Sequence, residues 1–563
     1  TPQTISGLDV SALTTPTEKS VALADSGIAK VIQLEQLNNP DSVITSVALQ
    51  QGSLLKEFAT AFEGAKTVDI IRFRIFFWEV EAISNDFWWF HNSSPSGRAA
   101  YSGCEYLSSN RSAGSAFQAN LGIYEACGIK VVGWECGKPC WGKKGISVAW
   151  MAKLPAALYV GSVFDNSAAV IIPRCVDDLP AVYAFMSSGD YLAEIRKINQ
   201  KVQVAAGTLD KVPFDLAHWQ KVAAEKYPHG LPMPFSSDAS QWLFNGHPAG
   251  ADQPLHVAVA RLVGYLWPRQ TGSSFPDCPA LGPDGLETLA DEDGIVCLAP
   301  VRGEASAVER LRKLMAAALG EEWSSAKERE LLLAIAVENN AKKPEPDLES
   351  WLRNSFFSEH CKVFHSRPFI WQVWDGHVNG FSALVNYHKL AAPNGQGRKT
   401  LDQLTFTYLG DWIDRQKLDQ VEGVNGADDR LAAALDLQGQ LKKILEGEPP
   451  YDIFVRWKPL QQQPIGWEPD INDGVRLHIR PFLNAQLRKG GKANAGILRA
   501  KPGTIKWSKD RGKEPMRSKD DFPWFWGLDE NNHSVATDYG APIPGAPSAG
   551  DSFDGNRWID LHY

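Results

Sequence analysis

The stretch Lys143–Pro173, KKGISVAWMAKLPAALYVGSVFDNSAAVIIP, decides the fold. Its apolar runs at Leu158–Val163 and Ala168–Ile172 are short and contain β-branched residues, which predicts buried strands. The next segment, LPAVYAFMSSGDYLAEIRKIN at 179–199, predicts two short helices that are broken at Ser187–Gly189. Strands followed by helices in this order indicate an α+β fold with a β-rich centre.

The sequence before this stretch predicts more sheet. Residues 68–83, VDIIRFRIFFWEVEAI, and the aromatic run Phe87–Phe90 have the composition of strands around an aromatic core. Nearer the start, helical patterns occur near Val31–Leu37 and Leu54–Phe62. After the two short helices, a third strand is predicted at Val202–Val204.

The rest of the chain predicts helices and, after Glu446, short strands among Pro, Gly and Trp residues. The helices are expected near Val257–Leu266, Ala305–Leu319, Ser325–Asn340 and, as the one strong helix of the C-terminal third, Asp428–Glu446. A single core is not expected at 563 residues. With linkers near 227–254 and 341–349, we expect a multidomain α+β protein with an N-terminal connector (1–66), a mixed β-rich domain (67–233), a helical connector (234–350) and an α+β C-terminal domain (351–563).

Composition is that of a globular protein, with 44% hydrophobic and 22% charged residues. No apolar run is long enough to cross a membrane, and no signal peptide is recognisable, so we expect no membrane partner. The eight cysteines form no disulfide framework, which favours a reducing, cytoplasmic location. The chain begins at Thr1 and has no closing element after Asp560, so we expect it to be one piece of a larger polypeptide.

Charge is distributed unevenly. The net charge is −9, yet thirteen basic residues and only two acidic ones lie between Arg476 and Lys519. Nucleic-acid binding needs lysine and arginine at phosphates, and such a block can supply them within an acidic protein. A solvated charged loop is the alternative interpretation of the same block.

No catalytic residues are predicted. An adenine methyltransferase needs a Gly-rich cofactor turn and an Asp/Asn/Ser-Pro-Pro-aromatic tetrapeptide that holds the target amine, and neither occurs. The nearest string, Glu448-Pro449-Pro450-Tyr451, has a longer side chain and follows a helix, so it is interpreted as a helix-stop turn. A phosphate-binding loop, a nuclease carboxylate set and a nucleophile elbow are also missing.

Two groups of residues are candidate metal sites. Cys136 and Cys140, with Cys104 and Cys127, have looser spacing than structural zinc sites usually show. His360, Cys361 and His365, with Asp375, His377 and His388, lie among dense aromatic residues that suggest packing instead. We therefore expect no metal site.

Several strings together resemble one protein family. The segments 143–173, 179–199 and 204–232 resemble the target-recognition region of large bacterial DNA adenine methyltransferases, the type IIG-like proteins of the phage-defence systems DISARM and BREX. The strings at 367–390, 404–416, 446–482 and 505–514 resemble the tail of the same proteins, most closely that of DISARM. The resemblance extends from about Gly7 to the end, and its strength lies in the order of the strings.

This resemblance implies a parent enzyme that uses S-adenosylmethionine to methylate adenine N6 and so marks host DNA. The family's cofactor loop and catalytic tetrapeptide would precede this chain, so no cofactor is expected within it, and residues 1–66 would be the trailing part of the methyltransferase domain. The implied partners are double-stranded DNA, the N-terminal catalytic half and, in addition, other defence subunits.

Candidate DNA contacts are basic residues that flank strands and helices, where loops reach a groove or a phosphate. Arg72 and Arg74 alternate with Phe73 in a predicted strand and so face away from it. Trp141 precedes a Gly-Lys-Lys-Gly loop and could stack on a base or pack within the protein. The full set is Arg72, Arg74, Trp141, Lys143, Lys144, Arg174, Arg196, Lys197, Lys201, Arg476, Arg480, Lys506, Lys509, Arg511 and Lys513.

Three functions remain open from sequence. The first is DNA recognition and clamping for the methyltransferase. The second is a protein-interaction scaffold that docks other defence subunits through the helical middle and the basic tail. The third is a self-sufficient enzyme such as a nuclease, with His360 or Asp375 at its centre.

Overall fold

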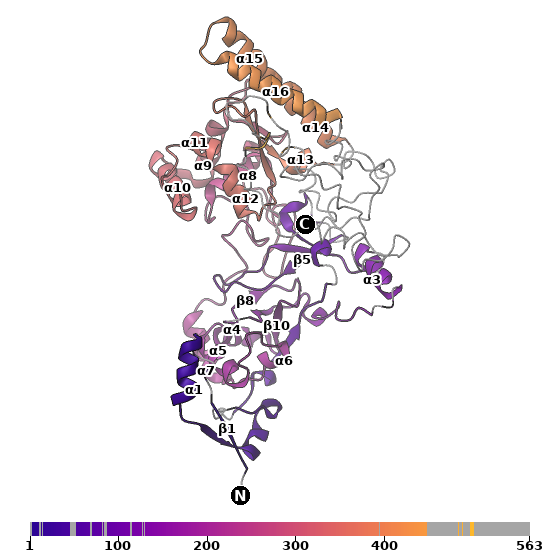
Figure 1. Ribbon diagram of the computed structural model, residues 1–563, viewed down its shortest axis with the longest axis vertical. Helices are drawn as coiled ribbons and strands as arrows, with labels where there is room; N and C mark the ends of the chain where they lie inside the picture. The colour runs from indigo at the N-terminus through magenta and orange to yellow at the C-terminus, as the bar shows by residue number, and fades with distance from the viewer. Residues whose placement is uncertain are drawn as a thin grey trace.

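The computed structural model describes residues 3–446, with gaps at 9, 11–12, 14, 46–51, 68–69, 82, 84–86, 113–114, 127, 129, 152 and 393–394, and also residues 482, 487 and 496–499. These residues form a multidomain α+β structure with several small sheets, as the sequence predicted. Helices α15 (Leu409–Val421) and α16 (Ala427–Glu446) lie at one end of the molecule, and β1 (Thr4–Gly7) and α1 (Pro16–Asp25) lie at the other (Figure 1).

The central sheet has four antiparallel strands in the order β3–β10–β7–β8. All side chains of β7 and β8 are buried, which explains their nearly continuous apolar sequence. The single strand predicted at 158–163 is divided, because the backbone turns at Gly161, where φ is +88°. The strands are β3 (Ala59–Glu63), β7 (Gly145–Ala149), β8 (Ala156–Tyr159) and β10 (Ala168–Pro173).

A second sheet has the order β4–β6–β5–β9, with β9 parallel to β5. Phe90 on one face packs against Trp242 and Phe275, so the expected aromatic core is present. The strand predicted from residue 68 is wrong at its start, because Ile70–Phe73 form the short helix α2. The elements here are β4 (Arg74–Phe76), η4 (Phe77–Glu79), β5 (Trp88–Asn92), β6 (Tyr106–Ser109), α3 (Ala116–Ala126), η5 (Lys138–Cys140) and β9 (Val163–Phe164).

The two short helices predicted after the central strands are confirmed. Pro180 lies in the first turn of α4, where its missing N–H costs nothing, and the Ser188 side chain accepts from the backbone N–H of Tyr191 to begin α5. The strand predicted at Val202–Val204 is not formed; only Gln203 bridges to Met151. The helices are η6 (Val176–Asp178), α4 (Leu179–Met186), α5 (Gly189–Ile198), α6 (Ala206–Leu209) and α7 (Leu216–Lys226).

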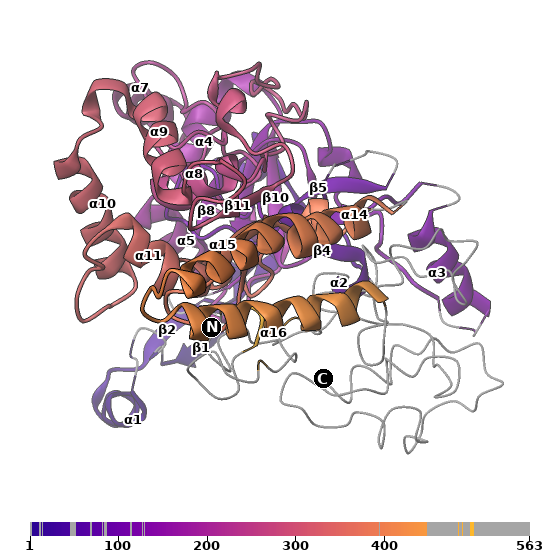
Figure 2. The same cartoon turned by 90° about the horizontal axis from the view of Figure 1, so that it is seen from above.

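The C-terminal half packs helices around a three-stranded sheet of order β11–β13–β12. Four predicted helices are confirmed as α8, α9, α10 and α16, but the expectation of one strong helix after residue 351 is wrong. Figure 2 shows α15 and α16 lying side by side. The further elements are α8 (Pro254–Leu262), η7 (Leu286–Leu289), β11 (Ile295–Cys297), α9 (Ala307–Leu319), η8 (Gly320–Glu322), α10 (Ser325–Glu338), α11 (Leu348–Asn354), α12 (Phe356–Val363), β12 (Ile370–Trp374), β13 (Ser382–Asn386), α13 (Tyr387–Leu390), α14 (Gln396–Asp402) and the π-helix η9 (Gln403–Tyr408).

Pairing crosses two of the boundaries expected from sequence. Strand β3 precedes residue 66 but pairs with β10, and β11 precedes residue 350 but pairs with β13. The element η4 also joins the β-rich and C-terminal parts, since the Trp78 indole N–H donates to the Arg367 carbonyl at 3.2 Å and Glu79 pairs with the Arg367 guanidinium at 3.4 Å. One contiguous buried cluster therefore runs from Leu55 to Leu498.

The N-terminal part up to residue 45 is less buried than the rest of the described chain. Strands β1 and β2 (Ala29–Ile32) pair only with each other, and no side chain of α1 is buried. Of the described apolar side chains, none before Leu55 is buried, and Leu34 is 72% exposed. The helical pattern at 31–37 corresponds to the 3-10 turn η1 (Gln33–Asn38), followed by η2 (Pro40–Ser42), whereas 54–62 was wrongly predicted and holds η3 (Leu55–Glu57) and β3.

None of the helices in the described ranges is long and apolar enough to cross a membrane.

Candidate nucleic-acid interface

One end of the central sheet gathers three of the predicted DNA contacts. The pairing of β10 with β7 ends at Ile171 opposite Ile146. Arg174 lies three residues beyond that pair on one strand, and Lys143 lies three residues beyond it on the other. Lys144 is adjacent to Lys143, so these cations emerge at the same end of a sheet whose interior is buried. Rigid strands of this kind hold contacting loops in place.

The loop that carries the lysines is fixed by a close contact between two glycines. The Gly142 N–H donates to the Gly161 carbonyl at 2.8 Å, and both residues have φ near +80°. A Cβ atom at Gly161 would lie 2.8 Å from the Gly142 backbone, closer than real Cβ contacts. Glycine is therefore required at 161, and this contact sets where Lys143 leaves the sheet.

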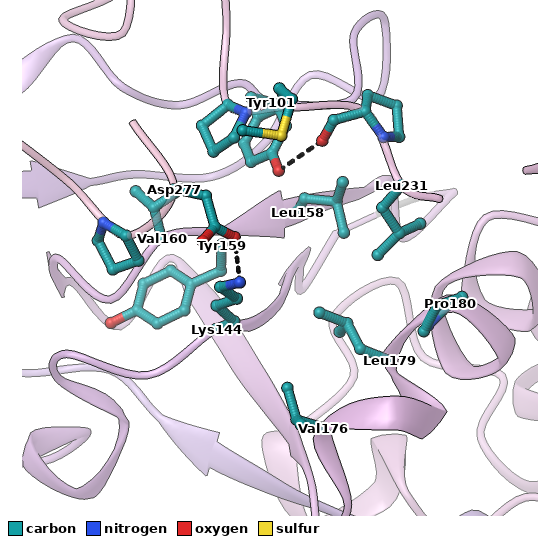
Figure 3. Close-up of a pocket in the computed structure, with 14 residues that line it drawn as sticks. Tyr101, Lys144, Leu158, Tyr159, Val160, Val176, Leu179, Pro180, Leu231 and Asp277 are labelled. Carbon is teal, nitrogen blue, oxygen red and sulfur yellow. Dashed lines mark hydrogen bonds and ion pairs between the residues drawn. The ribbon is translucent and has the colours of Figure 1, made fainter. Parts of the chain in front are cut away.

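The two lysines of the loop differ in their surroundings. Lys144 forms an ion pair with Asp277 and lines a cavity of about 240 Å³ beside β8 (Figure 3). Lys143 is exposed, and within the described part of the chain no hydrogen bond or ion pair holds its ammonium. Lys143 is thus the better placed of the two for a phosphate, because Lys144 is already neutralised.

Arg174 is exposed, and its guanidinium donates one hydrogen bond to the Lys56 carbonyl at 3.1 Å. Among the described residues the Arg174 guanidinium has no other hydrogen bond or ion pair, and an exposed arginine can bind a phosphate with two parallel bonds. Lys56 itself is exposed at the same sheet end and was missed from the sequence. Only the pairing of β3 with β10, more than 100 residues apart in sequence, brings it there.

The sequence leaves two roles open for Trp141, stacking on a base or packing within the protein, and in the structure its side chain packs. Its ring meets that of Trp89 edge to face at 5.6 Å, and the side chain is half-buried. The indole N–H is buried and, among the residues that the structure describes, has no hydrogen-bond acceptor. A base that stacked on this ring would have to displace the packing against Trp89.

Arg74 is held inside the fold. Its guanidinium lies 2.5 Å from the Asp165 carboxylate, whose side chain is 1% exposed, and also 4.2 Å from the centre of the Tyr106 ring. Burial would raise the pKa of Asp165, but the hydrogen bond and charge of His91 and the charge of Arg74 outweigh it and hold that pKa well below its usual range. A DNA contact by Arg74 stays a prediction that this geometry disfavours.

The His91 ring lies 3.2 Å from the same carboxylate and is fully buried. Burial lowers the pKa of His91 below its ordinary value, although Asp165 acts in the opposite direction. The ring is therefore neutral near pH 7, where Arg74 supplies the charge opposite Asp165, and the charge of His91 acts on Asp165 only at lower pH, once the ring is protonated.

The basic residues of α5 serve the helix and the loop after it. The Arg196 guanidinium donates to the carbonyl of Asn199, the C-cap of α5, at 3.4 Å and to the carbonyl of Lys201 in the loop that follows, and Lys197 pairs with Glu194 at 2.5 Å. Lys197 and Lys201 do not share a helical face, because α5 ends at Ile198. Lys201 is exposed, but it lies near the opposite end of β7 from Lys143 and Lys144. Gln203, two residues after Lys201, bridges to Met151, which follows β7, whereas Lys143 and Lys144 precede that strand.

Seven predicted DNA contacts have side chains outside the part of the chain that the structure describes. The backbone of Arg72 lies in α2, so the alternation argued for a strand does not apply to it, and its side chain lies outside the described set. Most of the basic block, the short strands expected after Glu446 and the Glu448–Tyr451 tetrapeptide also lie outside the described residues; of the basic residues in the block only Arg499 is described, and its guanidinium lies 4.4 Å from the centre of the Trp374 ring. The six contacts there are Arg476, Arg480, Lys506, Lys509, Arg511 and Lys513.

His360 and Asp375, the two residues considered for the centre of a nuclease site, have structural roles. In the described ranges, no group of three or more His, Cys, Asp or Glu side chains could hold a metal ion. His360 is fully buried and accepts from the Ile370 N–H at 3.1 Å. Asp375 accepts from the backbone N–H of His377 at 2.9 Å and of Phe381 at 2.7 Å, so it closes the hairpin between β12 and β13.

Comparison with models of protein families and with curated protein sequences found no match to this chain.

Proposed function

We propose that this chain recognises and grips double-stranded DNA for an N6-adenine methyltransferase of the phage-defence kind. In this proposal a separate catalytic half holds S-adenosylmethionine and the reacting groups. The supporting observation is the sheet end that presents Lys143, Lys144 and Arg174 from buried, rigid strands. Cations fixed in this way set the register of a protein on a duplex, while neighbouring loops reach base edges.

The net charge of −9 is compatible with this function because charges act locally. At physiological ionic strength, interactions between exposed charges fade beyond about 8 Å, so acidic helices farther away barely affect a phosphate at the sheet end. Contacts at Lys143 and Arg174 would therefore bind DNA even though the whole protein is acidic.

The test is the salt dependence of binding to a fluorescent 24-base-pair duplex, measured by anisotropy on the full chain. Log affinity falls against log salt with a slope of about −0.9 for each phosphate neutralised. Lys143→Ala/Arg174→Ala should make the slope shallower by about 1.8, which is about a tenfold effect between 50 and 200 mM salt. The matched control is Lys313→Ala/Arg329→Ala, which removes an exposed lysine and arginine from α9 and α10.

Two outcomes would count against the proposal. Binding of the unmodified chain that did not change with salt would refute a phosphate clamp. Equal slopes for the two double variants would refute the assignment of the interface to this sheet end.

A second candidate function, docking of other protein subunits, is favoured by the N-terminal part. Leu34, Leu37 and Ile28 there are each more than 60% exposed, and α1 buries none of its side chains. Clusters of exposed apolar side chains are typical of protein contacts. A gel shift with and without the catalytic half separates the two functions, because DNA binding that needs both polypeptides favours docking.

A further inference from the structure

The cavity beside the sheet end has apolar walls. Its volume is about 240 Å³, below the roughly 300–1,000 Å³ of pockets that take drug-sized ligands. Leu158 and Val160 come from the end of β8, Leu179 comes from the start of α4, and Leu231 comes from the loop after α7 (Figure 3). The cavity therefore has room for one small chemical group.

One wall of the cavity is polar. Lys144 and Asp277 face each other across it, and the dashed line in Figure 3 marks their ion pair. Asp277 has φ at +58°, in the left-handed region that aspartate adopts more readily than most other residues. The Tyr101 hydroxyl donates to the Pro232 carbonyl at 3.0 Å, which fixes the neighbouring wall.

The rim exposes apolar side chains next to free cations. Val176 is 63% exposed and Met233 is 64% exposed, and both line the cavity. Arg174 lies two residues before Val176, and Lys143 is adjacent to Lys144. A ligand that fits this rim has an apolar surface for Val176 and Met233 and negative charge beside it.

We propose that this cavity binds one unstacked nucleobase of a DNA strand whose phosphates lie on Lys143 and Arg174. The inference rests on the proposed function and specifies its ligand. The faces of a base match the apolar walls, and its polar edge offers donors to Asp277 and acceptors to Lys144. A phosphate alone fits the cavity poorly, because Asp277 already neutralises Lys144.

The experiment compares two single-stranded DNA 8-mers, one with normal bases and one with an abasic sugar at every position. Both have the same phosphates, so the ratio of their dissociation constants reports on the bases alone. We expect the unmodified chain to prefer the normal strand by about tenfold, in the range that one base-stacking contact gives. Val176→Trp fills the rim and should reduce this ratio to near one.

The matched control is Val202→Trp, since Val202 is also 63% exposed but does not line the cavity. Met233→Trp repeats the test from the loop after α7, and both rim side chains are exposed, so neither change disturbs the core. Equal binding of normal and abasic strands by the unmodified chain would overturn the inference. So would a ratio in Val176→Trp that equals that of Val202→Trp.

These results are separable from those of the duplex test. A slope unchanged in Lys143→Ala/Arg174→Ala would refute the proposed interface itself. A changed slope together with an unchanged base preference in both rim variants would refute the base site alone.

Discussion

Replacing Arg74 with methionine tests whether this residue stabilises the fold or contacts DNA. Arg74→Met leaves the buried Asp165 carboxylate without its guanidinium partner at 2.5 Å. Removing one member of a buried ion pair typically costs about 3–5 kcal/mol. The Asp165 carboxylate still accepts hydrogen bonds from the Ser167 backbone N–H at 2.9 Å and from the Ser167 hydroxyl. We therefore expect the free energy of unfolding to fall by an amount near the lower end of this range, about 3 kcal/mol.

The assay is urea unfolding at pH 7.5 followed by tryptophan fluorescence, with duplex anisotropy measured in parallel under folding conditions. Arg174→Met is the matched control, because Arg174 is exposed and should change stability by no more than about 0.5 kcal/mol. Arg74→Met/Asp165→Leu should recover most of the loss, since an apolar pair can replace a buried ion pair.

The same pair predicts a pH dependence. The folded-state pKa of Asp165 is held below its unfolded value by His91 and Arg74, against the effect of burial. The stability it contributes is therefore present above the ordinary carboxyl pKa of about 4 and is lost as the pH falls below that value. In Arg74→Met, the free energy of unfolding should therefore fall less as the pH is lowered through this range. Unchanged urea midpoints for Arg74→Met, combined with weaker duplex binding, would refute a structural role for Arg74.

Two further predictions concern a buried carboxyl group and a tight turn. Burial raises the folded-state pKa of Asp375 to about 7, so the folded chain retains a proton that the unfolded chain releases near pH 4. Stability should thus decrease between about pH 4 and about pH 7, by up to about 4 kcal/mol, and Asp375→Asn should flatten this range in urea unfolding at several pH values. Gly161→Ala should cost at least about 1 kcal/mol, because alanine is strained at φ +88° and its Cβ meets Gly142. It should also weaken duplex binding through Lys143, and an unaltered anisotropy titration would contradict this link.

Local signals in the sequence predicted the elements that depend on local chemistry. The break between α4 and α5 was predictable because Pro180 and Ser188 act on their own helices, through a fixed φ and a side-chain cap. The α+β class followed from the same reasoning. The helix predicted at 54–62 failed because β3 pairs with β10, and apolar spacing does not reveal a partner that far along the chain.

The candidate site was predictable only in part, for the same reason. Arg174 follows the strand predicted at 168–172, so its position at a strand end could be expected, whereas the strand β7 that follows Lys143 was not predicted. The burial of Arg74 could not be expected, because Asp165 lies 91 residues away and comes near only when β9 joins the sheet that contains β4. The sequence also did not reveal the ion pair between Lys144 and Asp277 or the position of Lys56 beside Arg174.

The contact of η4 with Arg367 has a consequence for dissecting the molecule. The segment 341–349 looks like a natural place to divide the chain, yet β11 on one side pairs with β13 on the other, and Trp78 and Glu79 bind Arg367 across the same division. A protease that cut there would leave two pieces held by a shared core. A shortened chain that ended at residue 340 would instead expose the apolar surface that β12 and β13 cover, and we expect it to aggregate.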